Sequence, residues 1–215
     1  MSFEPNRALI FDVGNVLLPV RLEATGEALA SRTGLSVEAI AARLIGCDVV
    51  RAYQVGRLTD DAFREALSVL LESPLAEPEF TEDWNASLPA EPIPPPDLLV
   101  AVHDAGLRVI ALSNTNARHA RHLARVCPWL FELTEPVLSH DIGAAKPGAK
   151  AFEAARAATG LDASACFFTD DDPRHVEAAR RFGFAAEHFT EEARCRRQLV
   201  RLGFLEASSL DRRGS

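Results

Sequence analysis

Residues 8–13 read Ala-Leu-Ile-Phe-Asp-Val, a short apolar run that delivers an aspartate near its end. Similar short apolar runs follow at 107–112, 136–139, 166–169 and 184–188. Helical spacing of apolar residues separates them, at 97–105, 148–159 and 173–182. Short apolar runs that alternate with helical segments are typical of buried parallel strands in βα units. The pattern predicts an α/β fold, a Rossmann-like parallel sheet with helices on both faces.

Residues 21–90 interrupt this alternation. Amphipathic segments without a strand pattern between them predict helices at 23–32, 36–44, 59–72 and 81–87. A proline-rich connector at 89–96 closes the stretch, because proline disfavours a helix interior. We therefore expect a core formed by 1–20 and 91–215, with an inserted helical-bundle cap at 21–90.

Composition and charge limit the classes of partner and the cellular location that we expect for this chain. The 215 residues include 23 basic and 31 acidic residues, for a formal net charge of −8, which disfavours nucleic acid and anionic membranes as partners. No apolar run approaches the about 20 residues that span a bilayer, and no signal-peptide pattern is present. The four cysteines form no CxxC pair, which favours free thiols and a cytoplasmic location. The oligomeric state is left open.

Polar residues follow three of the predicted strands, at the edge where open parallel sheets bind ligands. They are Asp12 after the first strand, Ser113 and Asn114 after the second, and Asp170 and Asp171 after the fourth. Carboxylates that converge on one crevice repel each other unless a cation neutralises them. Oxygen ligands without a His or Cys set favour Mg²⁺. Lys146 and backbone N–H groups after Ser113 could hold the anion that such a metal attracts.

Four segments together resemble the haloacid dehalogenase-like hydrolases, in that family's order and spacing. They are Leu9-Ile10-Phe11-Asp12-Val13-Gly14-Asn15-Val16-Leu17, Ala111-Leu112-Ser113-Asn114-Thr115-Asn116, Lys146-Pro147 and Phe168-Thr169-Asp170-Asp171. The resemblance covers nearly the whole chain, and the helical insert is similar to the family's small cap. Residues 53–63 and 139–143 add a likeness to the branch that contains bacterial α-D-glucose-1-phosphate phosphatase.

The resemblance implies a hydrolase of phosphoric monoesters that works with Mg²⁺. Asp12 would be the nucleophile that forms an aspartyl-phosphate, and Lys146 would neutralise charge on it and on the transferring group. Ser113 and Asn114 would bind the phosphoryl oxygens. The metal set would be Asp12, Gly14 through its backbone carbonyl, Asp170 and Asp171.

One departure from the family concerns proton transfer. The family carries a second aspartate two residues after the nucleophile, as general acid and base, and this chain has Gly14 there. Such catalysis contributes roughly 10²–10⁴-fold to a rate. Asn15 and Val16 also replace the family's usual Gly and Thr. His175 could exchange protons near neutral pH, but we favour a packing or surface role for it.

Three functions follow, in order of preference. The first is a Mg²⁺-dependent phosphatase of a small phosphorylated metabolite, with a sugar phosphate as one candidate. The second is a non-catalytic or impaired protein that binds phosphate esters, because Gly14 lacks a carboxylate. The third is a 2-haloacid dehalogenase, whose relatives also lack the second aspartate, although a metal-free enzyme has little use for the adjacent pair Asp170 and Asp171.

Two further features have ordinary structural interpretations. Asp172 precedes Pro173 and is expected to cap the helix that begins there, so we leave it outside the metal set. His119 and His122 share one face of a predicted helix with several arginines, and we expect a solvated basic face.

Overall fold

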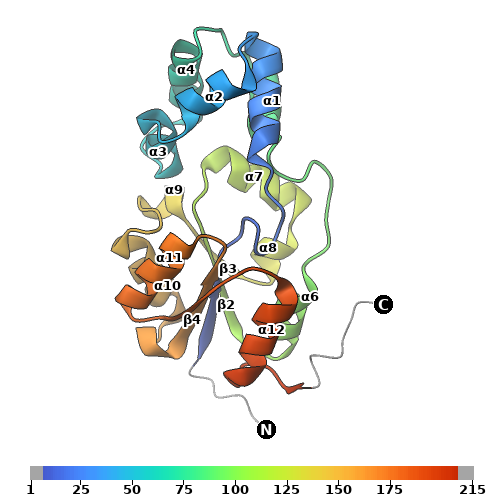
Figure 1. Cartoon of the computed structure of the whole chain (residues 1–215), viewed down its shortest axis with the longest axis vertical. Helices are drawn as coiled ribbons and strands as arrows, with labels where there is room; N and C mark the ends of the chain where they lie inside the picture. Colours follow the sequence, from blue (N-terminus) through green and yellow to red (C-terminus); the bar gives the residue numbers. More distant parts are fainter. Residues whose placement is uncertain (1–6, 208–215) are drawn as a thin grey trace.

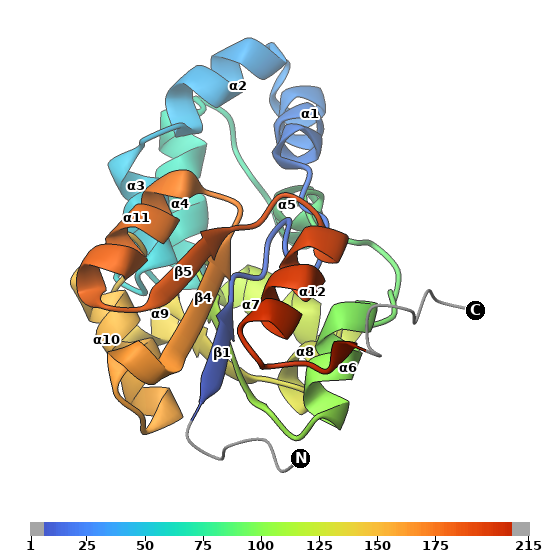
Figure 2. The ribbon, with the colours of Figure 1, turned by 60° about the horizontal axis from the view of Figure 1, so that its bottom comes forward.

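Five strands form one sheet in the order β3-β2-β1-β4-β5 (Figures 1 and 2). The computed structural model describes residues 7–207. The strands are β1 (Ala8–Phe11), β2 (Arg108–Ser113), β3 (Glu135–Leu138), β4 (Cys166–Asp170) and β5 (Ala185–His188). Every neighbouring pair is parallel, which confirms the predicted sheet. The chain runs outward from β1 through β2 to β3 and then returns to β4 on the other side of β1, so β1 and β4 flank the crevice where ligands of such sheets bind.

Helices cover both faces of the sheet, as its strand pattern requires. Leu9 and Phe11 belong to one hydrophobic cluster, whereas Ala8 and Ile10 belong to another, because successive strand residues face opposite sides. The first cluster includes residues of α6 (Asp97–Asp104), α7 (Ala117–Val126), α8 (Trp129–Glu132) and α12 (Glu192–Arg201). The second includes residues of α10 (Ala149–Thr159) and α11 (Pro173–Phe182). Two short elements complete this part, α9 (Ser139–Ile142) and η1 (Ala163–Ala165).

The stretch between β1 and α6 is helical and has a hydrophobic cluster of its own. Its helices are α1 (Leu22–Thr33), α2 (Val37–Leu44), α3 (Asp48–Gln54), α4 (Asp60–Leu70) and α5 (Glu79–Asn85). The Tyr53 and Phe63 rings stack with centroids 3.9 Å apart, and Trp84 meets Phe63 edge-on at 4.7 Å. Ser36 and Thr59 accept hydrogen bonds from the first turns of α2 and α4, as N-cap residues do. Figure 1 shows α1 to α4 beyond one end of the sheet.

Helix α3 was not predicted from the sequence. Its seven residues read Asp-Val-Val-Arg-Ala-Tyr-Gln, and Tyr53 is its one fully buried side chain. Two turns are too short to show a helical period, so neighbouring elements and not the local pattern decide that this segment is helical.

The expected solvated basic face on α7 holds for Arg121 and Arg125, which are exposed, but not for Arg118 and His122. Arg118 is only 5% exposed, and His122 is buried as well. The Arg118 guanidinium donates to Glu77 at 2.6 Å and to the Asp60 carbonyl at 3.2 Å. Because these partners lie in the distant helical insert, the sequence near α7 shows the positive charge but not the groups that bury and neutralise it.

The environment expected from composition can be compared with the structure in two respects. All four cysteines are free, and three of them are buried. Within residues 7–207, the helices are too short or too polar to cross a membrane.

The helical insert meets the core through a close backbone approach at Gly56, in the turn between α3 and α4. Gly56 has φ +69°, and a Cβ atom at this position would lie 2.1 Å from the His140 carbonyl oxygen in α9. Nearby, the Ser139 hydroxyl lies 2.6 Å from the Gln54 carbonyl oxygen and can donate to it. A side chain at position 56 would therefore separate the insert from α9.

We expect Gly56→Ala to destabilise the protein more than Gly46→Ala. Gly46 has φ +72° but no heavy atom within 4 Å of its Cβ position, so it reports the backbone term alone, about 1–2 kcal/mol. Gly56→Ala adds a clash with backbone, and overpacking costs typically 1–3 kcal/mol more. Urea unfolding of both variants measures the difference, and equal losses would show that the contact is dispensable.

Candidate active site

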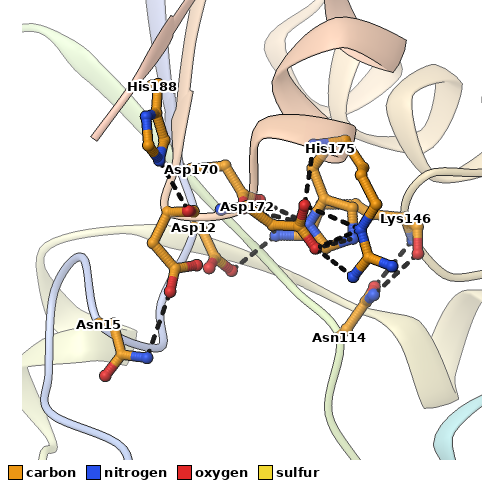
Figure 3. Close-up of polar contacts among 10 residues, drawn as sticks. Asp12, Asn15, Asn114, Lys146, Asp170, Asp172, His175 and His188 are labelled. Carbon is orange, nitrogen blue, oxygen red and sulfur yellow. Dashed lines mark hydrogen bonds and ion pairs between the residues drawn. The ribbon is translucent and has the colours of Figure 1, made fainter. Parts of the chain in front are cut away.

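Asp12 lies where β1 ends, next to the end of β4. The strand register pairs Phe11 with Thr169, and the Asp12 N–H donates to the Thr169 carbonyl at 2.9 Å. The next residue along β4 is Asp170, so the topology brings the Asp12 and Asp170 side chains to one edge (Figure 3). Both are buried, and this edge is the one that the sequence predicts for ligand binding.

Lys146 connects these two carboxylates. Its Nζ donates to Asp12 Oδ1 at 2.6 Å and to Asp170 Oδ2 at 2.7 Å, and its side chain is 1% exposed. Asn114 holds the Lys146 backbone, because its amide accepts from the Lys146 N–H at 2.8 Å and donates to the Lys146 carbonyl at 2.9 Å. The end of β2 thus positions the lysine. The contact of Asn114 with a phosphoryl group remains a prediction.

The buried charges alter one another's protonation. Burial raises the pKa of the Asp12 carboxyl; Lys146 opposes this change and Asp170 adds to it. Burial acts to raise the pKa of Asp170 too, but hydrogen bonds and charges from His175 and Lys146 outweigh it and lower that pKa. Burial acts to lower the pKa of Lys146, but the two carboxylates raise it. Asp12 is therefore the carboxylate whose charge is least compensated, and a further cation beside it would be favoured.

Three carboxylates could hold such a cation. Asp12, Asp170 and Asp171 each offer an oxygen, and these atoms lie within 4.8 Å of one another. Carboxylate oxygens are the donors that Mg²⁺ prefers, and three of them around one lysine leave negative charge that fits a dication. The side chains that the sequence assigns to the metal thus converge. Gly14 lies two residues beyond Asp12 and could add its carbonyl.

Outer contacts orient the acidic pair. His175, in the first turn of α11, places Nδ1 3.0 Å from Asp170 Oδ1, and the Asp172 N–H donates to the same oxygen at 2.8 Å. The Asp172 side chain accepts from the Arg174 N–H at 2.8 Å, so it caps α11 as expected. His175 Nε2 lies 3.9 Å from Asp172 Oδ2. The expected packing or surface role for His175 therefore omitted its main contact, which is with a candidate metal ligand.

Asn15 is the second functional candidate that sequence reasoning missed. Its φ of 55° lies in the left-handed region, which asparagine tolerates better than most residues. Its amide donates to Asp171 Oδ2 at 3.2 Å and accepts from the Val20 N–H at 3.0 Å. Asn15 thus joins the acidic pair to the segment that leads into α1. Its departure from the family's usual residue was the signal that could have drawn attention to it.

We expect Asn15→Gly to weaken Mg²⁺ binding by about tenfold, because residues that orient metal ligands contribute roughly 10–100-fold to affinity and Asn15 is exposed. Glycine keeps the left-handed backbone and removes only the side-chain contacts. Calorimetric titration with Mg²⁺ gives the dissociation constant.

The matched control is Glu72→Gly, at the other described non-glycine residue with positive φ, 54°. Glu72 is exposed and pairs with Arg43 in the helical insert, so its replacement should leave Mg²⁺ affinity unchanged. If both substitutions weaken Mg²⁺ binding equally, the loss of affinity comes from backbone entropy and not from the contact between Asn15 and Asp171.

The Ser113–Asn116 segment lies between β2 and α7. Ser113 is buried at the end of β2, and the Asn116 side chain caps α7 by accepting from the His119 N–H at 3.1 Å. The Thr115 N–H donates to the Ser139 hydroxyl at 2.9 Å. A capped helix N-terminus beside Lys146 is suited to an anion. The assignment of Ser113 to phosphoryl oxygens remains a prediction.

Comparisons with known proteins agree with this geometry. A model of the haloacid dehalogenase-like (HAD-like) hydrolases matches residues 6–183. The chain is 31% identical over 206 residues to Phosphatase MT3486 of Mycobacterium tuberculosis (strain CDC 1551 / Oshkosh), covering 90% of this chain and 92% of that protein. A protein from Porphyromonas gingivalis described as a predicted HAD-like family hydrolase has a TM-score of 0.78 at 24% identity, over 93% of this chain and 98% of that one. The HAD family enzyme bt-2542 from Bacteroides thetaiotaomicron, in complex with magnesium and inorganic phosphate, has a TM-score of 0.74 at 21% identity, over 87% and 96% of the two chains. The chain belongs to the haloacid dehalogenase-like hydrolase family.

Proposed function

We propose that this hydrolase is a Mg²⁺-dependent phosphatase of a small phosphorylated metabolite, a sugar phosphate among the candidates, in the cytoplasm. The observation that carries the proposal is the buried Lys146, which links Asp12 to Asp170 while Asp171 completes a cluster of metal-binding size. The curated relative is named a phosphatase, and the Bacteroides enzyme binds magnesium and phosphate. Both names support the same class of reaction.

Each residue of the site has a separate role in this proposed reaction. Asp12, Asp170, Asp171 and the Gly14 carbonyl would hold Mg²⁺, which when bound neutralises the carboxylates and attracts the phosphoryl group. An Asp12 oxygen attacks phosphorus as the bond from phosphorus to the leaving oxygen breaks, and water then hydrolyses the resulting aspartyl-phosphate to phosphate and free Asp12. Lys146 holds Asp12 in place and balances its charge, and Asn114 holds Lys146. Ser113 and the N-terminus of α7 bind phosphoryl oxygens.

Residues 21–90 would act as a cap over the site, with 1–20 and 91–215 as the core. The insert contacts α7 and α9, which begin directly after β2 and β3, so it lies at the carboxyl ends of the strands. The Gly56–His140 approach and the burial of Arg118 between the two parts support this position.

The test is phosphate release from a broad panel of phosphorylated metabolites, with Mg²⁺ and with excess chelator. Turnover that requires Mg²⁺ supports the proposal. Tight binding of a phosphate ester without turnover would instead support an impaired binding protein. Halide release from a 2-haloacid in chelator would support a dehalogenase, which the carboxylate cluster disfavours.

A further inference from the structure

The loop after Asp12 offers no side chain that could protonate a leaving group. Its residues are Val13, which is buried, Gly14 and Asn15. A Cβ atom at Gly14 would lie 3.1 Å from Val20 Cγ2, so an apolar side chain closes the space beside this position. Gly14 has no positive φ that would require glycine. The protein therefore presents no acid at the position two residues beyond Asp12, and a side chain there would be in tight contact with Val20.

The other ionisable side chains at this edge of the sheet already form contacts with residues of the site. Lys146 bridges Asp12 and Asp170. His175 directs Nδ1 to Asp170, and its Nε2 is closest to Asp172 among charged partners. Asp171 belongs to the carboxylate cluster and accepts from Asn15, and His188 places Nε2 2.9 Å from the Asp171 carbonyl oxygen. In an in-line displacement the leaving oxygen lies across phosphorus from the attacking Asp12 oxygen, so it lies on the opposite side from Lys146, which contacts Asp12.

We propose that this protein acts on phosphate compounds whose leaving group departs as a stable anion, namely acyl phosphates and phosphate esters of acidic hydroxyls, in preference to simple alkyl phosphates. This inference rests on the proposed phosphatase function. It also explains the effect of Gly14. Without a general acid at this position, the protein favours substrates whose leaving group needs no proton.

Neither phosphoryl transfer to Asp12 nor hydrolysis of the aspartyl-phosphate requires a proton from the protein. In the first, an Asp12 oxygen forms a bond to phosphorus, the bond from phosphorus to the leaving oxygen breaks, and the electron pair stays on that oxygen. In the second, water forms a bond to phosphorus, and the electron pair of the aspartyl-phosphate bond returns to Asp12. The water proton passes to solvent. The second leaving group is a carboxylate, which departs as a stable anion by itself.

A rate series measures the preference. With wild-type protein and Mg²⁺, kcat/KM is determined for acetyl phosphate, for aryl phosphates of graded leaving-group acidity, and for an alkyl phosphate of similar size. A general acid contributes about 10²–10⁴-fold, so the alkyl phosphate should fall at least about 10²-fold below the most acidic aryl phosphate. A flat series, with alkyl and aryl phosphates turned over equally, would overturn the inference and leave the phosphatase function standing.

A matched variant separates the missing acid from the intrinsic reactivity of the substrates. Gly14→Asp combined with Val20→Ala supplies a carboxyl and the space for it, and Val20→Ala alone is the control. The double variant should raise alkyl phosphate turnover selectively and flatten the series. If it folds and the series keeps its slope, the preference does not come from position 14. If wild type releases no more phosphate than Asp12→Asn from any substrate, including acetyl phosphate, the proposed function is wrong. This inference, which rests on it, is then wrong as well.

Discussion

Asp12→Asn should lower phosphate release by at least about 10³-fold, a loss of the size seen when an enzyme's nucleophile is removed. An amide cannot attack phosphorus and form the acyl-phosphate bond that a carboxylate forms. The substitution keeps the size of the side chain and leaves Lys146 paired with Asp170 at 2.7 Å, so the fold should persist. Steady-state assays with the best substrate of the panel measure the loss.

The control for Asp12→Asn is Asp172→Asn, in the loop that follows β4. Asp172 caps α11 and lies outside the carboxylate cluster, and asparagine caps a helix about as well as aspartate. It should therefore keep most of the activity. A second reading comes from mass spectrometry of quenched reactions, in which wild type should carry one phosphoryl group and Asp12→Asn none. Retention of more than a tenth of wild-type activity by Asp12→Asn would exclude it as the nucleophile.

The strand-end residues could be predicted because parallel topology fixes their location. Asp12 and Asp171 follow strands, Asp170 ends one, and the order of the strands places β1 beside β4. The apolar runs indicate the strands and place these carboxylates at one edge of the sheet, whereas the strand order that brings β1 beside β4 comes from the structure.

The contacts of Asn15 and His175 could not be predicted in the same way. Asn15 reaches Asp171 through a left-handed backbone turn, and His175 reaches Asp170 because α11 starts at the angle that Asp172 and Pro173 set. Such geometry depends on loop conformations that no hydrophobic period encodes. Arg118 is a further example, because its burial depends on the Glu77 carboxylate and the Asp60 carbonyl of the insert, which are about 40–60 positions away in the chain.

Lys146→Met should cause the largest loss of stability among single substitutions at the site. Methionine keeps the length of the side chain but leaves Asp12 and Asp170 buried together without the ammonium between them. Removing one partner of a buried ion pair costs about 3–5 kcal/mol, and activity should fall as well because Asp12 loses its positioning contact. Chemical unfolding at neutral pH gives the free energy. Lys150→Met, at the other lysine of the chain, is exposed and should change neither quantity.

The pH dependence of Lys146→Met tests the electrostatic cause. In wild type, burial already raises the pKa of Asp12, and removal of the lysine should raise it further because two carboxylates then face each other. An acid whose pKa is higher in the folded than in the unfolded state binds more protons when folded. The free energy of unfolding therefore falls as the pH rises from the unfolded pKa of about 3.9 through the folded one. The deficit of the variant should shrink as the pH is lowered from neutral toward that lower limit, whereas a packing defect would persist at every pH.

Two changes that reduce the unbalanced negative charge should restore stability to Lys146→Met. Added Mg²⁺ binds the carboxylates that the lysine no longer neutralises, so it should raise the melting temperature of Lys146→Met more than that of wild type. The double variant Asp12→Asn with Lys146→Met removes one negative charge together with the positive one, so it should be more stable than Lys146→Met alone. If neither the cation nor the second substitution restores stability, Lys146 supports the fold through packing and its role as the counterion of Asp12 is wrong. Restoration by both would show that one positive charge between β1 and β4 holds this site together, whether a lysine or a metal supplies it.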